Sequence, residues 1–227
     1  MSTQVEEPLA RTAAAVDMVM TLEIGPWGLD RFLALVGDRR SPRIKYRDGS
    51  LTLVSPSRKH ERGSDRIDDL IKAACTGLNI PVLPFASTLF RAPGKDHGIE
   101  ADKSYYVENE AAVRGLDADE VDLSVYPPPD LVVEVVVSHG ADRSLSICGE
   151  MGVPEVWVYR ERRRSLEFLH LGPDGRYASA PASRAFPFLA PADILPWVET
   201  PAGEGYLAWE GRLRAWVRDE LAVRGRP

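Results

Sequence analysis

The stretch PPPDLVVEVVV, residues 127–137, decides the expected fold of this chain. Three prolines end whatever precedes them, and a run follows in which valine dominates and a single acid, Glu134, interrupts. A short apolar run rich in β-branched residues is typical of a strand that is buried on both faces. The stretch therefore predicts a central strand within a sheet that other layers cover.

Glu134 is the most informative residue of this strand. Alternation places it on one face together with Val132 and Val136. A carboxylate in such a place has to be neutral, paired or bound to a cation, because burying it bare costs several kcal/mol. Two interpretations stay open at this point: a structural ion pair with one of the arginines, or a cation site.

A second acidic pattern lies in GIEADKSYYV, residues 98–107. If this segment is one strand, Glu100, Asp102 and Ser104 share a face, with about 7 Å between successive members. These acids, with Glu134 on a neighbouring strand, would give the oxygen ligands that Mg²⁺ or Mn²⁺ prefers. The alternative is an exposed edge strand whose acids are solvated.

Local patterns predict the remaining elements. The segment RIKYRDGSLTLVS, residues 43–55, has two alternating runs around Asp48-Gly49 and indicates a β-hairpin. Apolar spacing predicts helices over residues 27–36, from Pro56 and Ser57 to Leu78, over 142–151 and over 205–224. Further strands are expected within residues 81–107, 152–161 and 165–172.

This order of elements predicts an α/β (α+β) fold with a mixed β-sheet flanked by helices, rather than an alternating doubly wound fold. Three parts are expected: a flexible N-terminal tail over 1–24, a domain over 25–200 that includes the N-terminal β-hairpin, and a C-terminal amphipathic helix in an extension over 201–227. Trp209 and Trp216 on that helix suggest a homodimer interface, and packing on its own domain is the alternative.

Composition restricts the class of protein. The chain has 227 residues, 44% hydrophobic and 27% charged, which is an ordinary globular balance. A net charge of -6 argues against a protein that coats nucleic acid, but it allows a local basic groove. No apolar run is long enough to span a membrane, the N-terminus lacks the pattern of a secretion signal, and two cysteines give no disulfide framework, so a cytoplasmic protein is expected.

His60 and Glu61 lie in the first turns of the predicted helix that ends at Leu78. His60 falls on the apolar stripe of this helix and Glu61 on its flank. An inward histidine is more often a hydrogen-bonded core residue than a catalytic one. An acid in the first turn can act simply by favouring the helix N-terminus.

Five fragments in order resemble one family: DGSLTLVSPSRKHE, ASTLFRAP, GIEADKSYYV, PPPDLVVEV and GVPEVWVYR. They are similar to the Uma-two family of putative restriction endonucleases, within the PD-(D/E)xK nuclease superfamily, over about residues 43–188. The resemblance implies a restriction-endonuclease-like core with its metal site at one end of the sheet.

The resemblance also implies roles for particular residues. Asp102 and Glu134 match the two carboxylates that hold Mg²⁺ (or Mn²⁺), and the backbone carbonyl of Val135 matches a further ligand. His60 and Glu61 match a polar pair that supports the metal or the water. The ion would position and activate a water molecule and stabilise the charge on the attacked phosphate.

One departure from the family pattern concerns its basic residue. The superfamily lysine would fall on Val136, and the position from which this family often supplies a basic group is Ser144. Arg143 precedes it and is expected to support the phosphate, although arginine cannot act as a general base at neutral pH. Cys148 also replaces the usual aromatic residue of that helix.

The leading hypothesis is a Mg²⁺-dependent DNA endonuclease that hydrolyses phosphodiester bonds. Val136 and Ser144 motivate the alternative, a catalytically impaired nuclease-fold protein that binds DNA or a protein partner. A third interpretation is a hydrolase that uses the paired carboxylates on a substrate other than nucleic acid.

Overall fold

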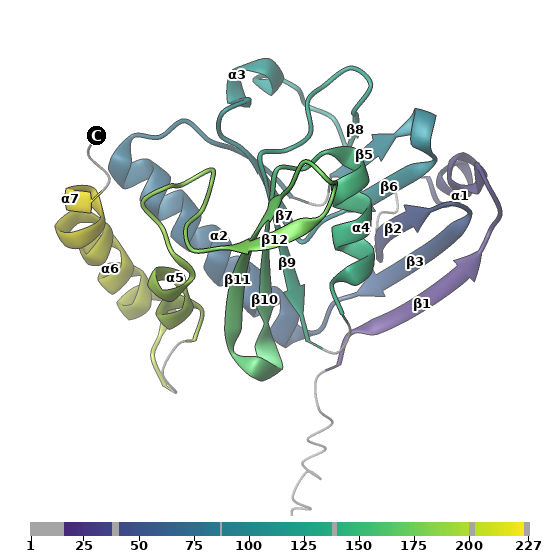
Figure 1. Ribbon diagram of the computed structural model, residues 1–227. Helices are drawn as coiled ribbons and strands as arrows, with labels where there is room; N and C mark the ends of the chain where they lie inside the picture. The colour runs from purple at the N-terminus through teal and green to yellow at the C-terminus, as the bar shows by residue number, and fades with distance from the viewer. Residues whose placement is uncertain (1–15, 38–40, 87, 138–139, 200–202, 225–227) are drawn as a thin grey trace, which may run out of the picture.

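Two six-stranded mixed sheets and the helices around them make up the protein (Figure 1). The computed structural model describes residues 16–37, 41–86, 88–137, 140–199 and 203–224. The α/β class and the mixed strand directions predicted from sequence are confirmed, with one difference. The strands are divided between two sheets, where a single sheet was expected.

The sheet that contains Glu134 is called sheet B. Its strand order is β12 (Tyr177–Ala180), β11 (Ser165–Leu171), β10 (Glu155–Arg160), β9 (Leu131–Val136), β7 (Lys103–Tyr106) and β4 (Leu83–Phe85). The strands β9 and β10 are parallel, and the other neighbours are antiparallel. The predicted central strand is confirmed, because β9 pairs on both sides and residues 131–135 are buried.

The other sheet, sheet A, has the order β1 (Met18–Glu23), β3 (Ser50–Ser55), β2 (Arg43–Arg47), β6 (His97–Glu100), β5 (Leu89–Ala92) and β8 (Glu120–Asp122). The predicted hairpin is β2 and β3. Asp48 and Gly49 turn between them with φ of 49° and 86°. Positive φ at both central residues matches the twist of antiparallel strands, which explains the Asp-Gly pair here.

Helices pack on both faces of sheet B, and the first helix of the chain packs on sheet A. They are α1 (Gly28–Val36), α2 (Arg58–Leu78), α3 (Glu110–Val113), α4 (Asp142–Met151), α5 (Pro191–Val198), α6 (Tyr206–Trp216), the π-turn η3 (Val217–Leu221) and α7 (Ala222–Arg224), with short 3-10 turns at η1 (Pro93–Lys95) and η2 (Glu161–Arg163). The side chain of Ser57 caps α2 by accepting the backbone N–H of His60, so this helix begins as the sequence predicts.

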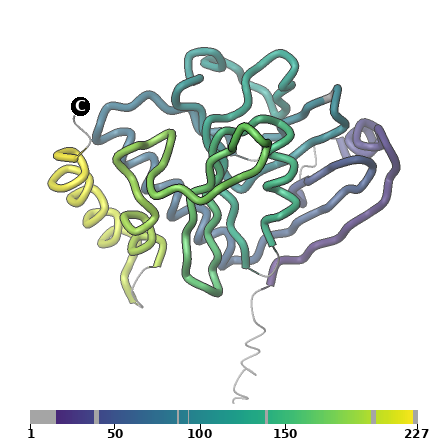
Figure 2. The backbone as a smooth tube through the Cα atoms, viewed as in Figure 1, coloured from purple at the N-terminus to yellow at the C-terminus, as the bar shows by residue number. Residues whose placement is uncertain are grey.

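Two main hydrophobic clusters result from the alternation along β9. Residues 131, 133 and 135 face a cluster formed with α2, α5 and α6, while Val132 faces a second cluster formed with α4 and with strands of sheet A. The helix α4 therefore lies between the sheets, against β6 and β2 (Figures 1 and 2). Glu134 shares the face of Val132, so its side chain is directed toward this junction of the sheets.

Two expectations from the sequence are wrong in detail. The segment 98–107 is not one strand, because β6 belongs to sheet A and β7 to sheet B, and the chain crosses between the sheets at Ala101 and Asp102. Residues 18–23, expected within a flexible tail over 1–24, form β1 and pair with β3 along its full length. Residues 1–15 lie outside the described residues.

The C-terminal helix packs on its own domain. Trp209, Leu213, Val217 and Leu221 are at most 3% exposed and belong to the cluster that contains α2. The indole N–H of Trp209 donates to the backbone carbonyl of Trp197 at 3.0 Å. Its most apolar side is thus occupied within the chain, which favours the alternative to a dimer interface.

The first prediction concerns this helix. Trp209→Ala should lower the free energy of unfolding by about 3–5 kcal/mol, because the indole is fully buried and would leave a cavity. Leu207→Ala, on the same helix and 81% exposed, should change it by less than about 0.5 kcal/mol. Urea unfolding followed by circular dichroism measures both. Equal effects of the two substitutions would show that the helix is not part of the core.

Candidate active site

Asp102 and Glu134 lie side by side where the two sheets meet. Asp102 occupies the crossing between β6 and β7, and Glu134 lies in the middle of β9; they are 3% and 2% exposed. The backbone N–H of Val135 donates to Asp102 Oδ2 at 2.7 Å. The two carboxylates that the sequence selects are therefore brought together at one buried place.

Asp102 is held by two cationic side chains. Arg43 Nη1 donates to its Oδ1 at 2.8 Å, and His60 Nε2 lies 2.8 Å from its Oδ2. The other ring nitrogen of His60, Nδ1, lies 3.0 Å from Asp17 Oδ2. Asp17 in turn accepts the backbone N–H of Ser57 at 2.8 Å. The imidazole is consequently fixed between two carboxylates at the start of α2.

Glu134 has a different set of partners. Lys45 Nζ lies 2.6 Å from its Oε2, and Ser144 Oγ donates to the same oxygen at 2.9 Å. The second oxygen, Oε1, is buried and has no hydrogen-bond partner among the residues that the structure describes. An orphaned carboxylate oxygen in the interior is costly unless a cation or water satisfies it.

Burial and charge move the pKa values of this cluster in opposite directions. Burial disfavours charged His60, but the Asp102 and Asp17 carboxylates outweigh it and raise its pKa to about 9. Burial favours protonated Asp102, but His60, Arg43 and Lys45 outweigh it and lower its pKa to about 2. His60 and Asp102 therefore form a charged pair at neutral pH.

Burial raises the pKa of Glu134, and the charge of Asp102 adds to this, although Lys45 acts against both. Burial alone would lower the pKa of Lys45, but the charges of Glu134 and Asp102 overcome it and raise that pKa. The two carboxylates thus repel one another, and the cations around them keep the arrangement stable.

A cavity of about 230 Å³ adjoins the cluster. Asp17, Lys45, His60, Glu134 and Arg143 contribute its polar lining, and Val19, Thr21 and Thr52 of sheet A close it. Arg143 comes from the first turn of α4, and its guanidinium donates to the backbone carbonyl of Ser50. Burial lowers the pKa of Arg143, as expected for a cation held partly out of water.

The remaining candidates, Glu61 and Glu100, lie outside the cluster. The side chain of Glu61 is 41% exposed and forms an ion pair with Arg43 at 3.1 Å, so it contacts Asp102 only through the arginine. Glu100 Oε2 accepts the backbone N–H of Ile44 at 3.0 Å, inside sheet A. The sequence suggested that Glu100 and Asp102 are neighbours on one strand, and this is wrong. Glu100 instead binds the backbone of β2.

Three residues of the site were missed from sequence: Arg43, Lys45 and Asp17. A signal existed for the first two, because RIKYR alternates basic and apolar residues and places its three cations on one strand face. The opposite face carries Ile44 and Tyr46, which are 2% and 0% exposed. Asp17 had no comparable signal, since it lies within the segment 1–24 that was expected to be a tail.

The residues present fit a divalent cation of the magnesium type. No group of three or more His, Cys, Asp or Glu suited to a metal is found in the described part of the chain. Mg²⁺ commonly uses one or two carboxylates and completes its shell with water and substrate phosphate. Asp102, Glu134 and the carbonyl of Val135 would supply such a set, and the orphaned Glu134 Oε1 is the oxygen best placed to accept a cation.

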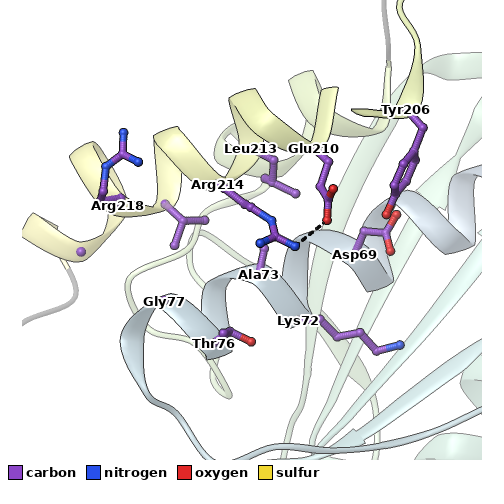
Figure 3. Close-up of a pocket in the computed structure, with 12 residues that line it drawn as sticks. Asp69, Lys72, Ala73, Thr76, Gly77, Tyr206, Glu210, Leu213, Arg214 and Arg218 are labelled. Carbon is purple, nitrogen blue, oxygen red and sulfur yellow. Dashed lines mark hydrogen bonds and ion pairs between the residues drawn. The ribbon is translucent and has the colours of Figure 1, made fainter. Parts of the chain in front are cut away.

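A larger cavity, of about 600 Å³, lies elsewhere, between α2 and the C-terminal helix (Figure 3). Its charged side chains include Lys72 and Arg214, which are 51% and 71% exposed, and Arg214 pairs with Glu210. None of the candidate residues from the sequence lines it. Solvated charges of this kind are weak evidence for a site, so the buried acids remain the candidate active site.

A solved structure has a similar fold. The structure is similar to the crystal structure of a putative nuclease belonging to DUF820 from Anabaena variabilis, with a TM-score of 0.57 and 16% identity; the match covers 75% of this chain and 98% of the other. The sequence model of the Uma2 family, described as "Putative restriction endonuclease", matches residues 29–203. The chain belongs to this family, and the resemblance seen in the sequence is confirmed.

No curated protein sequence matches the chain. Among the described residues, no helix has the length and apolar character needed to cross a membrane.

The second prediction is a pH dependence of stability, measured in the presence of a chelator. His60 has a pKa raised from 6.5 to about 9, so its contribution is complete below pH 6.5 and is lost as pH rises through about 9. The pKa of Asp102 is lowered from 3.8 to about 2, so its contribution to stability is complete above pH 3.8 and is lost as pH falls through about 2. The charged pair is thus fully effective between about pH 4 and pH 6.5.

His60→Gln should therefore abolish the part of the stability loss between pH 6.5 and 9 that His60 causes. The measurement is the free energy of unfolding in urea at each pH, for wild type and variant. Glu220→Gln is the control, because that side chain is 60% exposed. Parallel curves for wild type and His60→Gln would contradict the assignment of a raised pKa to His60.

Proposed function

We propose that the protein is a Mg²⁺-dependent (or Mn²⁺-dependent) DNA endonuclease. The observation that carries the proposal is the buried pair Asp102 and Glu134, one of whose oxygens has no hydrogen-bond partner in the described structure, beside a cavity. Membership of a family described as putative restriction endonucleases supports the choice of a phosphodiester bond as substrate.

The candidate residues from the sequence have the following roles in this proposal. Asp102 and Glu134, with the carbonyl of Val135, would hold the ion, which supplies an activated water and charge stabilisation at phosphorus. His60 orients Asp102 through their contact at 2.8 Å. Glu61 orients Arg43, and through it Asp102. Arg143, at the wall of the cavity, is placed to support the phosphate.

The reaction is a hydrolysis. The oxygen of water forms a bond to phosphorus, and the bond between phosphorus and one ester oxygen breaks. The attacking water loses a proton to solvent, and the leaving oxygen takes up a proton to become a hydroxyl. Both charges that develop, on the phosphate and on the leaving oxygen, are negative, so fixed cations and donors in a buried site favour the transition state.

A second candidate, a binding module without catalysis, keeps a specific basis. Val136 and Ser144 occupy the two positions from which the family resemblance predicts a basic side chain. Neither residue can carry a positive charge. Under this alternative the acid cluster would be a structural remnant, and the protein would bind DNA or a protein partner without turnover.

The third prediction separates these candidates. Wild type should nick or linearise supercoiled plasmid in Mg²⁺ or Mn²⁺, and a chelator should stop it. Glu134→Gln and Asp102→Asn should each lower the rate at least about 100-fold, as expected when a preorganised charge at the reacting centre is removed. Glu220→Gln is the matched control, because that side chain is 60% exposed.

Gel electrophoresis of the plasmid gives the rates, and circular dichroism shows that each variant is folded. Cleavage that persists in both acid variants would refute the assignment of the site. A folded wild type that binds DNA but cleaves none under any of these conditions would establish the binding module instead.

A further inference from the structure

Lys45 is a cation that reaches the acids of sheet B from sheet A. It lies on β2, and its side chain is 14% exposed. Its Nζ lies 2.6 Å from Glu134 Oε2 and 2.6 Å from Ser144 Oγ. Two consecutive elements, β9 and α4, thus meet at one ammonium group that comes from a strand far away in the sequence.

The strand β2 fixes the direction of this side chain. Ile44 and Tyr46 are packed in the core on one face of the strand, so Lys45 has to project from the other. The two flanking cations on that face are also engaged: Arg43 pairs with Asp102, and Arg47 pairs with Glu150 at 2.6 Å. The ammonium is therefore held in register by its neighbours as well as by its own contacts.

Ser144 marks the same place from the opposite side. Its hydroxyl contacts both Lys45 and Glu134. The Oγ atom of Ser144 and the Nζ atom of Lys45 are 2.6 Å apart, so the two side chains end at the same place. Position 144 is where the sequence led us to expect a basic group, and serine stands there. The structure supplies the missing positive charge at that point from a different element.

Lys45 also borders the cavity, so it is placed to contact more than its counter-ion Glu134. It lines the cavity of about 230 Å³ together with His60 and Arg143. Its partner oxygen is Oε2 of Glu134, while Oε1 of the same carboxylate has no hydrogen-bond partner among the described residues. A cation bound at Oε1 and the ammonium at Oε2 would face the same cavity from the two sides of one carboxylate.

Arg43 is less suited to contact a substrate. Its guanidinium is committed to two fixed partners, Asp102 and Glu61. An ammonium has three rotatable donors on a flexible stem, so Lys45 can keep one contact and give another to an incoming oxygen. Charge-assisted hydrogen bonds to phosphate are among the strongest that proteins make.

We propose that Lys45 is a catalytic residue, whose ammonium donates a hydrogen bond to a non-bridging oxygen of the attacked phosphate and supplies the positive charge that positions 136 and 144 lack. The role rests on the proposed nuclease function and deepens it. Lys45 transfers no proton in this role; it stabilises the charge that develops while the water-to-phosphorus bond forms and the ester bond breaks.

The fourth prediction tests this role with Lys45→Met. The substitution should lower the rate of plasmid cleavage at least about 100-fold, because it removes a fixed donor from the transition state. It should not weaken the binding of Mn²⁺ alone, measured by titration calorimetry without DNA, since a positive charge next to the carboxylates opposes the metal. Lys72→Met, a half-exposed lysine farther along α2, should leave both quantities unchanged.

An exchange variant, Lys45→Ser with Ser144→Lys, keeps the composition of the pair and moves the ammonium to α4. It should cleave at least about 10-fold faster than Lys45→Met, because a charge at the same place meets the same phosphate. An exchange variant that binds Mn²⁺ and cleaves no faster than Lys45→Met would contradict the proposal that the place of the ammonium is decisive.

The outcomes separate this inference from the function on which it rests. A folded wild type without cleavage overturns the nuclease function, and the role of Lys45 with it. Cleavage by wild type that Lys45→Met retains overturns the role of Lys45 alone. Cleavage lost together with Mn²⁺ binding in Lys45→Met also overturns it, because Lys45 would then act only by holding Glu134 in place.

Discussion

The burial of two carboxylates at the junction of the sheets is the constraint on which this structure depends. Asp102 and Glu134 are almost completely inaccessible, and they repel one another. Such a pair is tolerated only if cations and donors approach from several sides. Arg43 and Lys45 come from sheet A and His60 from α2, so the packing of three separate elements is tied to one charged cluster.

The same constraint explains the path of the chain at Asp102. A strand that continued straight from β6 would stay in sheet A, but the chain bends there and enters sheet B as β7. At the bend, Asp102 accepts the N–H of Val135 from β9, while Glu100, one residue before the bend, accepts the N–H of Ile44 from β2. Each acid accepts from a backbone donor of a different sheet, so Glu100 holds the start of the bend to sheet A and Asp102 holds its end to sheet B.

Much of the fold and the acid pair could be predicted from the sequence because both follow from local periodicity. The Asp-Gly turn, the apolar stripe along α2 and the valine run of β9 each predict their own element. Glu134 could be selected as a site residue because it is an acid inside an apolar run. Periodicity assigns a residue to a face but does not say what lies opposite. Lys45 could not be assigned to the site for that reason, and Asp17 lay in the segment expected to be a tail. The strand β1 was missed because an edge strand that is mostly exposed has a weak apolar signal.

The charge balance of the cluster links binding of metal and substrate under the proposed function. Arg43 pairs with Asp102 and Lys45 with one oxygen of Glu134, while the other oxygen of Glu134 has no hydrogen-bond partner among the described residues. A divalent cation would take over part of this pairing, which frees the ammonium of Lys45 to meet a phosphate oxygen while Arg43 keeps Asp102 in place. Lys45, which stabilises the buried Glu134, is then also the cation available to the substrate. The position of its ammonium group matters more than the strand from which the side chain comes. A nuclease site can therefore lose its basic residue from one element and keep its electrostatics through another, provided that both side chains reach the same carboxylate.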